Sequence, residues 1–119
     1  MNTDSIENLR KRLADFAECR DWDQFHSPKN LSMALIAEVG ELIEHFQWLT
    51  EEQSHSLAQD KKDQVAMELA DIFIYLIRIA DKLGVDLVDS ANKKILINES
   101  RYPIEKVRGK AGRASEFIS

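Results

Sequence analysis

Apolar side chains along this chain recur at helical spacing, three or four residues apart, rather than alternating as they would in a strand. Only four glycines and two prolines occur in 119 residues, so long stretches contain no helix breaker. We therefore expect an all-α fold, built as a four-helix bundle. The expected helices cover residues 3–20, 28–49, 62–83 and 86 to about 98–100, and the polar segment 50–61 predicts a linker.

Short polar signals mark where these helices begin and end. Ser27–Pro28 combines a capping hydroxyl with a proline at the first helical position. Gly84 is placed to end the third helix in a left-handed conformation, and Asp86 to cap the fourth. Tyr102–Pro103 ends the fourth helix, because proline disfavours helical geometry in the residue before it. Thr50 is placed to start one short turn inside the linker.

The third expected helix is apolar nearly all the way round, from Val65 to Ile79. Such a helix is buried, either in the core of its own chain or between chains. A domain of 119 residues has a core too small to cover it. We therefore expect a homo-oligomer, at least a dimer.

Charge and composition narrow the classes of function. The chain has 16 basic and 21 acidic residues, a net charge of -5, which argues against binding to nucleic acid. Cys19 is the only cysteine, so a disulfide within the chain and a thiolate zinc cluster are both excluded. The most apolar stretch, Ile72–Ala80, is too short to span a membrane and contains Arg78. With a charged first helix in place of a signal peptide, we expect a cytoplasmic protein without membrane contact.

The length predicts one domain, which we place at residues 1–103. Residues 104–119 are rich in Lys, Arg and Gly and predict a basic, flexible tail. The basic residues of this tail are Lys106, Arg108, Lys110 and Arg113.

Two pairs of acids interrupt the apolar pattern of the second and third helices. Glu38 and Glu41 are three residues apart, as are Glu68 and Asp71, so each pair projects from one side of its helix. Burying a carboxylate without a partner is costly, and the third helix offers few nearby cations. Mg²⁺ binds oxygen ligands and keeps waters that leave room for substrate phosphates. The acids therefore favour a Mg²⁺ site for phosphate chemistry, with Mn²⁺ as a substitute.

Other interpretations stay open on these residues alone. A Glu-x-x-Glu pair is common on exposed helices, where it binds nothing. A di-iron site uses Glu-x-x-His on two helices, and neither His26, His45 nor His55 follows an acid of these pairs by three residues. His45 follows Glu41 by four, so it can approach a metal. A helical interaction module, such as a regulatory dimerisation protein, would account for the apolar helices but not for the acids.

Residues well outside the acids complete a family pattern. Glu-x-x-Glu at 38–41 is followed by Glu-x-x-Asp at 68–71. Further matching segments, between about residues 9 and 103, are Asp21–Leu31, Phe46–Trp48, Ile74–Leu76, Gly84–Leu87 and the series Lys94, Asn98, Arg101, Tyr102 and Pro103. The chain resembles the MazG-like superfamily of all-α nucleoside triphosphate pyrophosphohydrolases, and within it the dCTP pyrophosphatase branch.

The resemblance implies a reaction and a metal. Water would attack the α-phosphorus of a (deoxy)nucleoside triphosphate, dCTP or a modified dCTP above all, giving the monophosphate and pyrophosphate. Glu38, Glu41, Glu68 and Asp71 would hold the Mg²⁺, and the homo-oligomer would be a tetramer. A related branch acts on other phosphorylated metabolites, such as a phosphoribosyl-nucleotide, but the tryptophan-bearing loop fits it poorly.

One departure concerns the general base. Many MazG-like proteins carry a further Glu directly before the first motif acid, where this chain has Ala37. The dCTP-type members also lack an acid there, so the departure favours that branch. The general base stays open between Glu41, with Glu38 beside it, and a water activated by the metal alone.

The resemblance also assigns substrate contacts. The residues that would hold the triphosphate are Lys94, Asn98, Arg101 and Tyr102. A lysine, an amide and a guanidinium on one side of a helix suit an anion. The residues that would form the nucleobase pocket, by stacking and by hydrogen bonds to a pyrimidine edge, are Trp22, His26, Asn30 and Trp48. The segment 94–102 is expected to reach across to a neighbouring chain.

Overall fold

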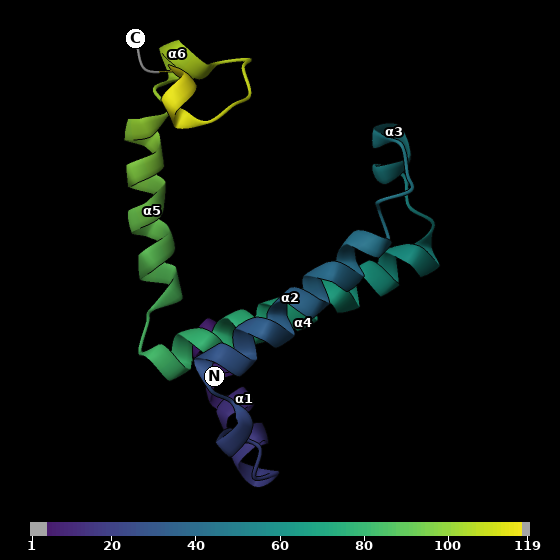
Figure 1. The fold of residues 1–119 in the computed structure, drawn as a ribbon, viewed down its shortest axis with the longest axis vertical. Helices are drawn as coiled ribbons and strands as arrows, with labels where there is room; N and C mark the ends of the chain where they lie inside the picture. Colours follow the sequence, from purple (N-terminus) through teal and green to yellow (C-terminus); the bar gives the residue numbers. More distant parts are fainter. Residues whose placement is uncertain (1–4, 118–119) are drawn as a thin grey trace. The chain divides into compact units, whose positions relative to one another are not determined.

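The computed structural model describes residues 5–117, and within that range every regular element is helical (Figure 1). The α-helices are α1 (Ile6–Cys19), α2 (Pro28–Glu44), α3 (Glu51–Ser54), α4 (Gln59–Leu83), α5 (Leu87–Arg101) and α6 (Ile104–Val107). The short 3-10 helices are η1 (Asp23–Phe25) and η2 (Ala114–Phe117). The all-α prediction is confirmed. Among the helices of residues 5–117, none has both the length and the apolar character needed to cross a membrane.

The helix ends follow the predicted caps. The Ser27 hydroxyl accepts a hydrogen bond from the backbone N–H of Asn30 at 3.1 Å, directly before the proline that opens α2. Gly84 ends α4 at a φ of 66°, a left-handed conformation that glycine adopts without strain. The Asp86 carboxylate accepts the N–H of Asp89 at 3.0 Å and starts α5. All three predicted caps are confirmed.

The segment between α2 and α4 differs from the expected boundaries. α2 ends at Glu44 rather than near residue 49. Beyond it, the N–H groups of His45, Phe46 and Leu49 bond to carbonyls three residues back, while that of Gln47 still bonds four residues back to Ile43. The helix therefore tightens into turns there, although no glycine or proline marks the change. Thr50 caps α3 as predicted, and α4 begins at Gln59, three residues earlier than expected.

The first of two compact units is Met1–Val85. In it, α2 and α4 lie side by side, and α1 packs against α4 (Figure 1). Asp23, before α2, bonds to Arg78 late in α4, whereas His45, after α2, contacts Lys61 early in α4. The two long helices are therefore antiparallel, and side chains from the middle of each face one another.

The second unit is Asp86–Ser119. Its described part contains α5, α6 and η2, and the rings of Tyr102 and Phe117 meet edge to face with centroids 6.2 Å apart. The domain boundary at residue 103 and the flexibility expected beyond it stay predictions.

The hydrophobic core of the described residues is small. The buried apolar side chains are Ala17, Leu31, Val65, Ile77, Ala80 and Ala114. Several large apolar side chains of α4 are exposed, namely Met67, Leu69, Phe73, Ile74 and Leu76. Apolar surface exposed to this extent is typical of a protein interface.

Candidate metal centre and substrate sites

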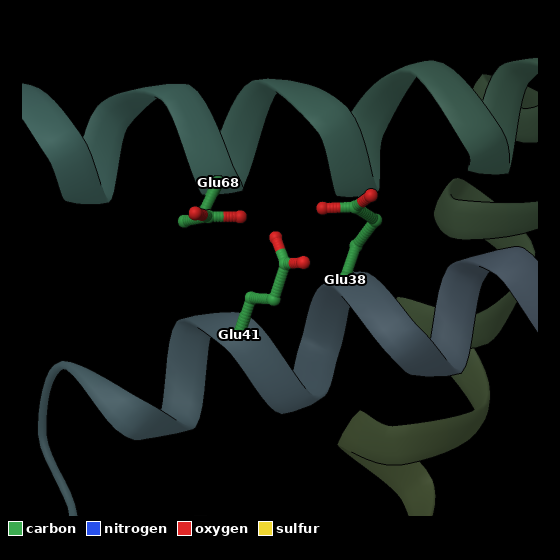
Figure 2. A group of neighbouring side chains, drawn as sticks. All are labelled: Glu38, Glu41 and Glu68. Carbon is green, nitrogen blue, oxygen red and sulfur yellow. The ribbon is translucent and has the colours of Figure 1, made fainter.

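Three of the four predicted metal ligands lie together between the long helices. Glu38 and Glu41 project from the middle of α2 toward Glu68 on α4 (Figure 2). One carboxylate oxygen from each lies within 4.8 Å of the others. The three-residue spacing places the first two on one side of α2, and the antiparallel pairing brings α4 against that side.

The carboxylates of this cluster lack the partners that burial normally demands. Oε2 of Glu38 and Oε2 of Glu68 are both buried and accept no hydrogen bond. A buried carboxylate oxygen without a donor is costly, because water is lost and nothing replaces it. The two orphaned oxygens therefore require a cation or a proton.

The electrostatics of the cluster favour the protonated form when no cation is present. Desolvation, a hydrogen bond with Glu41 and the negative charges of Glu41, Asp71 and Glu68 together raise the pKa of Glu38 to about 7. Desolvation also raises the pKa of Glu68, followed by the hydrogen bond and charge of Glu41, while a hydrogen bond with Glu38 and then the charge of His45 lower it. These shifts show that negative charge is held here at a cost.

The donor set fits a hard divalent cation. Carboxylate oxygens are the ligands that Mg²⁺, Mn²⁺ and Ca²⁺ prefer, and a cation held between the three carboxylates would supply the positive charge that they lack. Asp71 lies outside the three-residue group: it is exposed on α4, and its charge contributes to the raised pKa of Glu38. Its part in metal binding stays a prediction.

His45 lies at the edge of the acid cluster. Its Nε2 is 3.8 Å from Oε1 of Glu68, and Nζ of Lys61 is 3.1 Å from its Nδ1. Because a lysine ammonium only donates, Nδ1 accepts and the ring proton sits on Nε2, facing the carboxylate. At 3.8 Å this N–H group lies near the carboxylate without bonding to it, and a nitrogen that carries a proton cannot bind a metal, which argues against a direct metal ligand and against the di-iron alternative.

The predicted nucleobase residues do not meet in one chain. Trp22 and His26 lie before α2, and the Asn30 amide donates to the carbonyl of Phe25 at 3.0 Å, which fixes that loop. Trp48 follows α2 and is 84% exposed. The 17 residues of α2 rise about 25 Å between these two places. A single nucleobase cannot contact both ends, so one chain supplies only part of the predicted pocket.

A network of ion pairs holds the loop before α2 against α4. Oδ1 of Asp23 accepts hydrogen bonds from Lys82 at 2.6 Å and from Arg78 at 3.0 Å. These two hydrogen bonds, of which the one from Lys82 has the larger effect, hold the pKa of Asp23 below its usual value. Arg78 also reaches Asp81, which pairs with Arg10 of α1 at 3.1 Å. The sequence alone predicted no role for these residues. Arg78 could have pointed to the network, because a charged residue inside the apolar run 72–80 needs acidic partners when that run is buried.

The predicted phosphate ligands belong to the second unit. Lys94 and Asn98 lie one turn apart on α5, and Lys94 is exposed. Arg101 ends α5 with its guanidinium 5.8 Å from the ring centroid of Tyr102. These four residues therefore follow one another along the end of α5, as the helical spacing predicts.

The helical fold and the paired acids define a class: an all-α protein with a candidate divalent-cation site built across two antiparallel helices. A family model described as MazG-like matches residues 34–117. The chain belongs to the MazG-like family, as the sequence resemblance indicated.

Similar proteins support this assignment across nearly the whole chain. The chain is 43% identical over 115 residues to dCTP pyrophosphatase 1 of Bos taurus, covering 95% of this chain and 68% of that protein. With the same coverage of both proteins, the chain is 40% identical to dCTP pyrophosphatase 1 of Homo sapiens. A crystal structure of a pyrophosphatase from Archaeoglobus fulgidus superimposes with a TM-score of 0.77 at 34% identity, covering 82% of this chain and 91% of the other.

Proposed function

We propose that this protein hydrolyses dCTP or a modified dCTP to the monophosphate and pyrophosphate with Mg²⁺, and so removes unwanted nucleotides from the cytoplasmic pool. The enzyme class follows from the family and from relatives that are dCTP pyrophosphatases. The observation that carries the proposal is the pair of buried carboxylate oxygens, on Glu38 and Glu68, that accept no hydrogen bond.

Glu38, Glu41 and Glu68, with Asp71 as a fourth ligand, would hold the metal. Bound there, Mg²⁺ would neutralise the phosphates and stabilise the charge that develops on the leaving pyrophosphate. Among residues 5–117, no lysine or arginine forms an ion pair with Glu38, Glu41 or Glu68, and only His45 lies near, 3.8 Å from Glu68. The cluster therefore has more negative charge than its neighbours balance, which supports this assignment.

In the proposed reaction, a water oxygen bonds to the α-phosphorus as the bond from that phosphorus to the pyrophosphate oxygen breaks. Glu41 is exposed and adjoins Glu38 and Glu68, which each hold one buried oxygen, so it can reach solvent and accept the proton of the attacking water. Glu38 lies beside it as a second acceptor. The residues proposed to bind and orient the triphosphate are Lys94, Asn98, Arg101 and Tyr102.

We propose a homo-oligomer, at least a dimer and by family resemblance a tetramer, in which copies share active sites. Trp22 and His26 lie at one end of α2 and Trp48 at the other, so a base pocket that uses both needs two chains. The exposed apolar side chains of α4 supply a surface on which copies could associate. The segment 94–102 of one copy would then reach the acids of another.

The experiment that tests the function is pyrophosphate release with Mg²⁺ across a panel of canonical and modified deoxynucleoside triphosphates. Turnover of cytosine nucleotides above the others supports the proposal. Release from another phosphorylated metabolite alone, such as a phosphoribosyl-nucleotide, would replace the substrate class. No release of pyrophosphate from any substrate, combined with no thermal stabilisation by Mg²⁺, would favour a helical interaction module. Such a module would use the exposed apolar surface of α4 to bind its partner.

A further inference from the structure

Arg78 is the one charged side chain that is buried among residues 5–117, at 4% exposure. Its Nη2 lies 3.0 Å from Oδ1 of Asp23 and 3.3 Å from Nδ1 of His26, and its Nη1 lies 3.3 Å from Oδ2 of Asp81. The guanidinium thus touches the loop that carries a proposed nucleobase contact. A buried arginine on α4 connects to the substrate site through His26.

The contact between Arg78 and His26 fixes where the imidazole proton sits. A guanidinium carries only donors, so Nδ1 of His26 must accept the hydrogen bond and must itself be unprotonated. The neutral ring therefore carries its proton on Nε2. Desolvation lowers the pKa of His26, the positive charges of Arg78 and Lys82 lower it further and only the charge of Asp23 opposes them, so the surroundings favour the neutral ring.

We infer that Arg78 is a positioning residue for base selection: it holds His26 as the Nε2–H tautomer, so that the outer ring nitrogen is a permanent donor toward the nucleobase. This inference rests on the proposed function. N3 of cytosine accepts a hydrogen bond, whereas N3 of uracil and thymine carries a hydrogen. A fixed donor facing N3 therefore favours cytosine nucleotides over uracil nucleotides.

The loop does not depend on the His26 contact for its position. Lys82 binds Asp23 at 2.6 Å, and the Asn30 amide donates to the Phe25 carbonyl at 3.0 Å. Both contacts anchor the same loop without touching the imidazole. The Arg78–His26 hydrogen bond therefore adds control of the tautomer to a loop that is already held.

The first test is ¹⁵N NMR of the imidazole nitrogens in the wild-type protein at neutral pH, with His26→Gln identifying the signals. We expect His26 in the Nε2–H form, and a mixture of tautomers in Arg78→Met. A wild-type His26 protonated on Nδ1, or doubly protonated, would overturn the inference. This measurement needs no substrate, so it holds whether or not the proposed reaction occurs.

The second test is the ratio of kcat/KM for dCTP to kcat/KM for dUTP. Arg78→Met is expected to lower this ratio about tenfold through KM for dCTP, with kcat retained. Arg10→Met removes a neighbouring ion pair, with Asp81, that contacts neither His26 nor its loop, and should keep the wild-type ratio. An unchanged ratio in Arg78→Met, or a wild type that turns over both nucleotides equally, overturns the inference while the proposed function stands. A wild type that releases no pyrophosphate overturns the proposed function instead.

Discussion

Glu38 on α2 and Glu68 on α4 face each other across the helix pair, and each holds one buried oxygen that no donor satisfies (Figure 2). The helix pair therefore holds acidic side chains at positions where they do not stabilise the folded chain. Residues that lower the stability of a fold in this way are expected at functional sites.

Magnesium should stabilise the wild-type protein, and Glu68→Gln should remove most of that effect. At a concentration 100 times its Kd, a ligand of the folded state stabilises by about 2.7 kcal/mol. Glu68→Gln keeps the shape of the side chain but lacks the charge, so pyrophosphate release should fall roughly 100-fold. Thermal unfolding with and without Mg²⁺, together with the release assay, measures both effects.

Glu44→Gln is the matched control, because Glu44 is exposed on the same α2 helix and lies outside the acid cluster. It should keep the wild-type response to Mg²⁺ and the wild-type activity. Equal Mg²⁺ stabilisation of wild type and Glu68→Gln would contradict the metal assignment. Without metal, Glu68→Gln should be at least as stable as wild type, because it removes one of the repelling charges.

Without divalent ions, Glu38→Gln should become more stable relative to wild type as the pH rises. The pKa of Glu38 is raised from 4.5 to about 7 in the folded state. The folded protein therefore prefers the proton, and ionising Glu38 costs stability progressively between about pH 4.5 and pH 7. Urea unfolding in EDTA across this range measures the difference. A difference that is constant with pH would contradict the raised pKa.

Two glycines should respond oppositely to alanine. Gly84 has a φ of 66° at the end of α4, so Gly84→Ala should cost about 1–2 kcal/mol. Gly40 lies inside α2 with nothing within 4 Å of an added Cβ, so Gly40→Ala should stabilise by about 1 kcal/mol. Urea unfolding of both variants measures these changes. Stabilisation by Gly84→Ala would be inconsistent with its left-handed conformation.

The exposed apolar side chains of α4 should hold copies of the chain together. Phe73 is 40% exposed and lines an apolar hollow of about 350 Å³ between α1 and α4. Phe73→Glu should shift the protein from oligomer to monomer, because it places a charged carboxylate on the apolar surface proposed to join the copies, where burial would be costly. Light scattering after size exclusion measures the mass. A charge change of the same sign at an exposed polar site, Lys11→Glu, should leave the mass unaltered. A monomeric wild type would exclude the predicted assembly.

The sequence was sufficient for the elements whose chemistry is local. Gly84 and Asp86 act on their own helix ends, so their roles needed no knowledge of the rest of the chain. The spacing of Glu38 and Glu41 likewise fixed their common face. The end of α2 at Glu44 was not predictable, because the apolar pattern continues through Leu49 without a breaker.

Relationships between helices were harder to predict. Arg78 was visible as a charge in an apolar run, but its partners Asp23 and His26 are 55 and 52 residues away in sequence. Nothing local to α4 identifies them. The same limit applies to the predicted nucleobase pocket. That Trp22 and Trp48 lie at opposite ends of α2, too far apart to contact one base, becomes clear only when both residues are placed on the fold.

The separation of Trp22 and Trp48 by the length of α2 predicts how two inactive variants behave when they are expressed together. If each pocket borrows one tryptophan from a neighbour, Trp22→Ala and Trp48→Ala damage different chains of the same pocket. Co-expression of the two inactive variants should then restore some activity, since certain mixed assemblies contain one pocket with both indoles intact. Separately purified variants, mixed without subunit exchange, should stay inactive. Failure of the co-expressed pair to complement would mean that each chain works with only one of its two tryptophans.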